Sequence, residues 1–264
     1  MLLIVDGNMQ PAKIVDDLST DKILSATLAM IKSLHQQFPA SHLDIGSGEG
    51  SLIKLLKKNL SIVSSACDYT DSLMNEAGVK VEIVNLNYEK LPYKDDTFDI
   101  VSCTEVVEHL EHYRETIQEA YRVCNKDGTF VVTTPNILNL KSRLRFLFFG
   151  FYNLFGPLHF RESKLHSSGG HITPIGLFYL IHSLVDAGFS EIKISIDKRQ
   201  STSLIFLWIL YAPIMFISHF LLKTEVKKYK TVDSSNLFYV KKINSFDILT
   251  GRTIVVGCKK RVQI

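Results

Sequence analysis

The stretch Leu43-Asp44-Ile45-Gly46-Ser47-Gly48-Glu49-Gly50 joins a short apolar run to a glycine-rich turn. Residues 41–45 are expected to form a strand, and residues 51–59 a helix with leucines on one face. Glycines at alternate positions let the backbone take positive φ angles and pass close to a ligand. A strand, a glycine turn and a helix in this order predict a ligand site at the carboxyl end of a buried strand.

Strands and helices alternate on both sides of this stretch. Further strands are predicted at residues 61–67, 81–86, 98–103, 129–133, 191–196 and 252–259, and helices at about 10–40, 115–123 and 175–187. Alternation at this interval indicates parallel strands joined by right-handed crossovers. The pattern therefore predicts an α/β fold.

An acidic residue, Asp68, closes the second strand about twenty residues after the turn, where a carboxylate can bind both hydroxyls of a ribose. The glycine spacing is GxGxG rather than the GxGxxG of dinucleotide enzymes, and Glu49 would repel a pyrophosphate. A tight turn without a ligand is the alternative. The strand before, the helix after and Asp68 together favour a nucleoside site without a pyrophosphate.

Three later segments carry a resemblance to a known family. They are residues 87–101 (NYEKLPYKDDTFDIV), 105–110 (EVVEHL) and 171–189, which contains HITP and LVDAGF. With the glycine turn, they make residues 40–196 similar to the class I S-adenosylmethionine-dependent methyltransferases. The resemblance implies a Rossmann-like three-layer sandwich with a seven-stranded, mostly parallel sheet and an antiparallel last strand. It also implies S-adenosylmethionine as the cofactor.

The same resemblance implies which residues bind the cofactor. Asp44 would approach the methionine amino group, Asp68 would hold the ribose, and Tyr69 would cover one face of the adenine. Where the family usually has an aspartate that accepts from the adenine amine, this chain has Asn87, whose amide oxygen can also accept. The full expected set is Asp44, Gly46, Ser47, Gly48, Gly50, Asp68, Tyr69, Asn87, Cys103 and Thr104, the last two near the sulfonium.

Histidines are the candidate general bases, because a hydroxyl acceptor gains from a nearby base. His109 follows the fourth strand and His171 lies in the loop expected to cover the methyl group. The alternative for each is an ordinary polar or capping histidine, and Glu105 and Glu108 are expected to support or cap. His166 and His171 form a conceivable metal pair, but without a clear third ligand no metal site is predicted.

Two apolar segments interrupt the expected domain. Residues 144–160 are rich in aromatic residues and lie where this fold places acceptor-recognition elements. They are expected to form either a lid helix buried in the core, or an apolar substrate channel or membrane-facing surface. Residues 203–222 carry no formal charge, and basic residues flank them. Their length suits a membrane span. A return of the chain to the same sheet instead favours a re-entrant or surface-lying hairpin broken near Pro213, with dimerisation or internal packing as the alternatives.

Composition sets further limits. The 264 residues carry a net charge of +3, which is too mild to indicate nucleic-acid binding, and 46% are hydrophobic, enough for a full core. The four cysteines have no metal-ligand spacing and the N-terminus lacks the features of a signal peptide, so a cytoplasmic location is expected, with the inner face of the membrane as a second option.

These patterns predict an organisation and a function. Residues 1–40 are expected to form a helical cap, 41–200 and 249–264 the methyltransferase core, 141–170 an acceptor-side lid, and 201–248 an apolar insertion. The leading hypothesis is O-methylation of a small or lipid-linked acceptor at a membrane surface. The alternatives are methylation of a soluble molecule by a homodimer and a non-catalytic scaffold that binds the cofactor.

Overall fold

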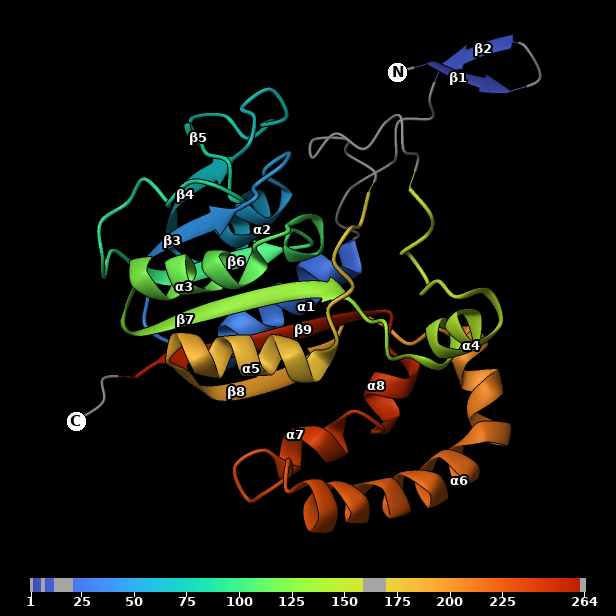
Figure 1. Ribbon diagram of the computed structural model, residues 1–264. Helices are drawn as coiled ribbons and strands as arrows, with labels where there is room; N and C mark the ends of the chain where they lie inside the picture. Colours follow the sequence, from blue (N-terminus) through green and yellow to red (C-terminus); the bar gives the residue numbers. More distant parts are fainter. Residues whose placement is uncertain (1, 6–7, 12–20, 159–169, 262–264) are drawn as a thin grey trace.

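Seven strands form the main sheet of the computed structural model, which describes residues 2–5, 8–11, 21–158 and 170–261 (Figure 1). These strands are β3 (Ala40–Ile45), β4 (Ile62–Asp68), β5 (Val81–Ile83), β6 (Phe98–Thr104), β7 (Cys124–Pro135), β8 (Phe189–Ile196) and β9 (Thr253–Lys260). Their order is β5-β4-β3-β6-β7-β9-β8, and only the pairs made by β9 are antiparallel. The predicted fold class is confirmed.

Helices cover both faces of this sheet and give three layers. The helices α1 (Asp21–Leu34) and α2 (Ser51–Asn59) pack on one face, and α3 (Tyr113–Val123) and α5 (Leu177–Ala187) pack on the other. Successive strand residues alternate between the two cores, as in any pleated strand. Val101 and Cys103 face α3 and α5, whereas Ile100 faces α1 and α2. All four cysteines are buried and unpaired.

The N-terminal segment differs from the predicted helical cap. Residues Leu2–Val5 (β1) and Asn8–Pro11 (β2) form an antiparallel two-stranded sheet. Within the described residues the helix runs from Asp21 to Leu34 and ends five residues before Pro39. Its apolar residues bury against β7 and β9, and this packing accounts for the periodicity seen in the sequence.

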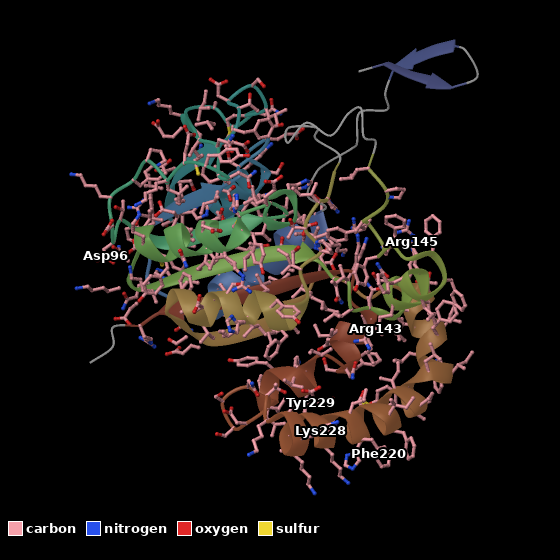
Figure 2. The ribbon with its side chains drawn as sticks, viewed as in Figure 1. Asp96, Arg143, Arg145, Phe220, Lys228 and Tyr229 are labelled. Atoms are coloured by element: carbon pink, nitrogen blue, oxygen red, sulfur yellow. The ribbon has the colours of Figure 1, made fainter. Side chains whose placement is uncertain are left out.

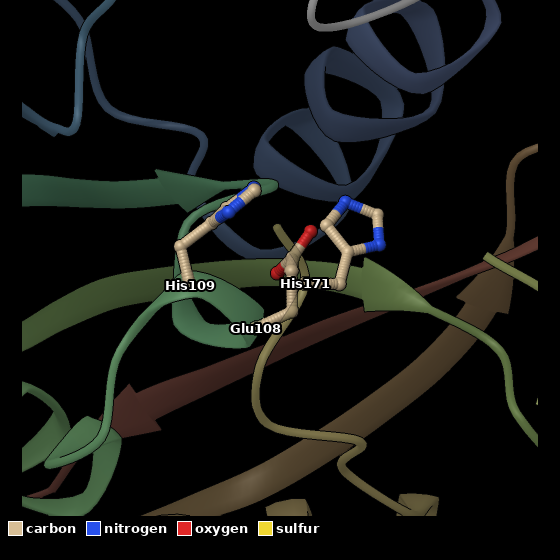
Figure 3. Close-up of side chains that lie close together, drawn as sticks. All are labelled: Glu108, His109 and His171. Atoms are coloured by element: carbon tan, nitrogen blue, oxygen red, sulfur yellow. The ribbon is translucent and has the colours of Figure 1, made fainter. Parts of the chain in front are cut away.

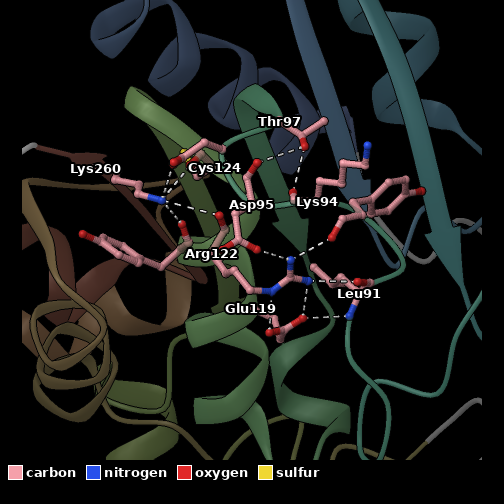
Figure 4. A network of polar contacts seen from close by, with 11 residues as sticks. Leu91, Lys94, Asp95, Thr97, Glu119, Arg122, Cys124 and Lys260 are labelled. Atoms are coloured by element: carbon pink, nitrogen blue, oxygen red, sulfur yellow. Dashed lines mark hydrogen bonds and ion pairs between the residues drawn. The ribbon is translucent and has the colours of Figure 1, made fainter.

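A polar network fixes the segment that precedes β6 (Figure 4). The Arg122 guanidinium on α3 donates to both carboxylate oxygens of Glu119, at 2.7 and 2.8 Å, and to Asp95 at 2.9 Å. It also donates to the backbone carbonyls of Leu91 and Tyr93. The planar guanidinium supplies five donors in a fixed fork, so one side chain holds the loop against the helix.

An apolar helix leaves the domain after β8. The helix α6 (Ser201–Thr224) continues without a break into a π-helical turn, η2 (Glu225–Tyr229), and the chain returns through α7 (Leu237–Lys242) and α8 (Phe246–Thr250) to β9. The predicted hairpin broken near Pro213 is therefore wrong. Figure 1 shows that α6 is strongly curved. Pro213 lies inside this helix, and a proline bends a helix because it removes one backbone hydrogen bond.

Replacing Arg122 by Lys is expected to lower the free energy of unfolding by about 1–3 kcal/mol, because one ammonium group cannot serve the same four partners. Urea unfolding followed by circular dichroism measures the change. Arg114→Lys on the same helix is the matched control, since Arg114 lies over the Tyr113 ring, a contact that lysine can also make. Equal stability of the two variants would contradict the role given to Arg122.

Candidate functional site

The glycine loop (residues 46–50) lies at the carboxyl end of β3 and is tied to β4. Gly46, Gly48 and Gly50 have φ angles of 70°, 49° and 78°, in the region that favours glycine. The Gly46 N–H donates to the Cys67 carbonyl at 2.8 Å. The Gly48 N–H donates to one carboxylate oxygen of Asp68, also at 2.8 Å. Asp68 thus turns toward the loop, as the ribose hypothesis requires.

Gly46 is also required by close packing. A Cβ atom at this position would collide with the side chain of Val106, which follows β6. The loop, β4 and the segment after β6 therefore meet at one edge of the sheet. This is the edge where open α/β sheets bind their ligands.

A chain of buried side chains holds Asp44 in place. The Ser102 hydroxyl donates to Asp44 at 2.6 Å, and His42 bridges the Ser102 and Ser64 hydroxyls at 2.8 and 2.9 Å. Burial raises the pKa of Asp44 to about 7, partly offset by the Ser102 hydrogen bond, and lowers the pKa of His42 to about 3. The Asp44 carboxyl group is thus poised to ionise when a cation approaches.

Two buried hydroxyls beside this loop have no hydrogen-bond partner within the described ranges. They belong to Ser47 and Thr104, which are 7% and 9% exposed. Buried hydroxyls without partners are costly and unusual in folded proteins. Both therefore fit a polar ligand that crosses the ends of β3 and β6.

Of the other residues predicted to bind the cofactor, Asn87 and Cys103 make contacts within the protein, whereas Tyr69 is exposed. The Asn87 amide oxygen accepts from the backbone N–H groups of Glu111 and His112, so both of its lone pairs are used. An adenine contact through this oxygen would require those bonds to be given up. The Cys103 side chain is fully buried in the core between the sheet and α3 and α5. Tyr69, by contrast, is 48% exposed at the end of β4.

The predicted histidines come together at the end of β6. A short 3₁₀ helix, η1 (Val107–His109), follows this strand, and the Glu108 carbonyl accepts from the backbone N–H groups of Ile172 and Thr173 at 3.0 Å each. The Thr173 hydroxyl donates to the Leu110 carbonyl at 2.6 Å. These bonds hold the His171 ring 4.8 Å from the His109 ring, centroid to centroid.

Burial dominates the electrostatics of this cluster. It lowers the pKa of His109, and it lowers the pKa of His171 to about 4 with a further contribution from His109. It raises the pKa of Glu105 to about 7 and that of Glu108 well above its ordinary value. Both imidazoles are consequently neutral at pH 7, and each keeps one ring nitrogen with a lone pair. His166, the other histidine of the metal pair considered from the sequence, lies outside the described residues.

Sequence reasoning missed His42 and Ser102 as supports and Glu108 as a direct member of the histidine cluster. Alternation along β3 puts His42 on the same face as Asp44, and Ser102 is the register partner of Asp44 in β6. The strand pattern therefore held a signal for both. The side chain of Glu108 gave no comparable signal, because its orientation depends on the η1 turn.

Comparison with known proteins finds methyltransferases that are similar to this chain. Residues 43–132 match the family model described as a methyltransferase domain. The chain is 27% identical over 152 residues to the uncharacterised methyltransferase YcgJ of Bacillus subtilis, an alignment that covers 52% of this chain and 56% of YcgJ. It is 31% identical over 105 residues to the quinone-biosynthesis C-methyltransferase UbiE of Rickettsia prowazekii, covering 34% of this chain and 42% of UbiE.

Solved structures extend the likeness to most of the fold. A methyltransferase from Archaeoglobus fulgidus aligns with a TM-score of 0.53 and 17% identity over 90% of this chain and 93% of that protein. Identity at this level speaks for the fold alone. The chain spans only about half the length of YcgJ and less of UbiE. Motif, fold and family model nevertheless agree: residues 43–132 carry a methyltransferase domain, and the chain has the fold seen in S-adenosylmethionine-dependent methyltransferases.

Proposed function

We propose that the protein transfers a methyl group from S-adenosylmethionine to the oxygen of a small or lipid-linked acceptor. The observation that carries the cofactor site is Asp68, turned onto the Gly48 N–H, with the unpartnered hydroxyls of Ser47 and Thr104 beside it. In this proposal Asp68 binds the ribose, and Asp44 receives the methionine ammonium group. Tyr69 lies beyond Asp68, where the adenine is expected.

The acceptor side is assigned to His109 and His171. S-adenosylmethionine supplies an electrophilic methyl carbon, which bonds to the acceptor oxygen as the carbon–sulfur bond breaks and its electron pair passes to sulfur. The hydroxyl proton passes to a neutral imidazole of this pair. The names of relatives give different methylated atoms: carbon for UbiE and nitrogen for the sarcosine/dimethylglycine methyltransferases. The proposal of oxygen as the methylated atom therefore rests on this histidine pair.

An apolar surface supports a lipid-linked acceptor. The apolar arm (residues 201–229) is the one helical segment of the described chain long and apolar enough to cross a membrane, and none of its most apolar window is buried. Trp208 is 92% exposed, and Phe148 on α4 (Leu140–Phe149) is 82% exposed. Side chains of α4 and α6 line an open apolar groove of about 670 Å³ between these helices.

The topology favours contact with one leaflet over a span. The residue before α6, Gln200, bonds to Thr250 beside β9, so both ends of the insertion belong to the same domain. The outer end carries Lys223, Lys227, Lys228 and Lys230, suited to anionic headgroups. Figure 2 shows Phe220, Lys228 and Tyr229 together at the part of the arm far from the sheet. Self-association through the same surface is the alternative, with a soluble acceptor.

Asp68→Asn is expected to weaken the binding of S-adenosylhomocysteine at least about tenfold, because a charged hydrogen bond to a ribose hydroxyl is lost. Isothermal titration calorimetry measures the affinity. Asp71→Asn is the matched control, since Asp71 is exposed three residues further on. An unchanged affinity in a folded Asp68→Asn protein would refute the ribose assignment.

The affinity for S-adenosylhomocysteine is expected to increase with pH between about 5.5 and 7.5, by on the order of tenfold in total. Below its pKa of about 7 the free Asp44 carboxyl group holds a proton, which a bound ammonium group must displace. Rising pH removes that cost. In Asp44→Asn this slope should be lost, and calorimetry at several pH values tests it; an equal slope in both proteins would contradict the contact.

Trp208, the single tryptophan, reports membrane contact directly. Its emission is expected to shift to shorter wavelength when vesicles containing anionic phospholipids are added, because the indole leaves water. Phe148→Glu should reduce flotation with those vesicles, whereas Tyr179→Glu, at an exposed aromatic residue on α5, should not. An unshifted emission together with a dimer in sedimentation would favour the soluble alternative.

A further inference from the structure

Glu108, His109 and His171 form a compact cluster of potential metal ligands. One ligand atom from each side chain lies within 4.8 Å of the other two. Figure 3 shows the Glu108 carboxyl group between the two imidazole rings. The three side chains come from η1 and from the segment strapped onto it, so backbone hydrogen bonds already fix their relative positions.

Hydrogen bonding leaves one nitrogen free on each ring. His109 Nδ1 lies 3.1 Å from the Gly170 carbonyl oxygen, which can only accept, so Nδ1 carries the proton and Nε2 keeps its lone pair. His171 makes a backbone hydrogen bond with Leu154, while its Nδ1 has no partner in the described part of the chain. Histidine ligands of metals commonly donate their second ring N–H to a carbonyl in this way.

The Glu108 carboxyl group lacks hydrogen-bond partners, and this independently points to a bound cation. The residue is 0% exposed, and neither carboxyl oxygen accepts an aligned hydrogen bond from the residues that the structure describes. The Thr134 hydroxyl lies near enough to favour the charged form, yet it too has no aligned partner there. Burying such a group unpartnered is costly, and a cation removes the cost.

We propose that Glu108, His109 and His171 bind one divalent transition-metal ion. Two imidazoles and one carboxylate suit such ions, with Zn²⁺ the best example, and three protein ligands leave a position open. The ligand atoms of a tetrahedral Zn²⁺ ion lie about 3.4 Å apart, so binding would draw the most distant pair together by about 1.4 Å from the present 4.8 Å. The sequence directed attention to His166 and His171, and the fold supplies Glu108 and His109 as the missing ligands.

The open position defines what the ion would do. With the ion bound, both imidazoles coordinate it and neither can take the acceptor proton, so the ion would replace the imidazole base. If the proposed methyl transfer holds, a hydroxyl bound at the open position would release its proton to solvent more readily, because a divalent ion lowers the pKa of a bound hydroxyl group. This role rests on the proposed function. Metal binding itself does not depend on it.

Titration of the chelator-treated full chain with Zn²⁺ tests the site. We expect a single tight ion per chain by calorimetry, and visible absorption from Co²⁺ at the same site. His171→Ala and the isosteric Glu108→Gln should each weaken Zn²⁺ binding at least about tenfold. His182→Ala should not, because His182 is an exposed histidine on α5, outside the cluster.

Two results would overturn the proposal: no tight ion in the wild-type chain, or the same affinity in His171→Ala and Glu108→Gln. Circular dichroism establishes that the variants are folded. Calorimetry of the same preparations with S-adenosylhomocysteine separates the two hypotheses. Normal nucleoside binding without an ion defeats only the metal site, and ion binding without the nucleoside defeats only the proposed function.

Discussion

The hydrogen bond from the Gly48 N–H to the Asp68 carboxylate is the interaction on which the cofactor side of this protein depends. It couples a loop that follows β3 to the residue that ends β4. Parallel register makes this possible, because Ile45 pairs with Cys67 on one side and with Cys103 on the other. The next residues, Gly46, Asp68 and Thr104, therefore leave the sheet together at one edge.

The same edge concentrates polar groups that the fold alone does not satisfy. Ser47, Thr104 and Glu108 are buried with polar atoms that lack partners among the described residues. Each lowers the stability of the domain by the cost of desolvation. The side chains that support Asp44 are paired, by contrast, in the chain from Ser64 through His42 and Ser102. A site for polar ligands needs supporting side chains held by hydrogen bonds, and polar groups left free to bind the ligand.

Two structural units meet at this edge and divide the chemistry between them. In the proposed site, the ends of β3 and β4 would hold the nucleoside, whereas η1 and residues 170–174 carry the two histidines and Glu108. The second unit is held by backbone bonds to the Glu108 carbonyl and is followed directly by α5. The apolar arm joins the same domain beside β9, because the Gln200 N–H donates to the Thr250 carbonyl.

The sequence by itself determined the strand, the glycine loop and the helix of residues 41–59, the role of Asp68 as the end of β4, and the fold class. These features depend on local periodicity and on φ angles that glycine allows. Only the tertiary structure joined His171 to Glu108 and His109, directed the Asn87 oxygen to the backbone at Glu111, buried Cys103 and carried α6 unbroken past Pro213. Those outcomes depend on contacts between residues far apart in the chain, which no local pattern encodes.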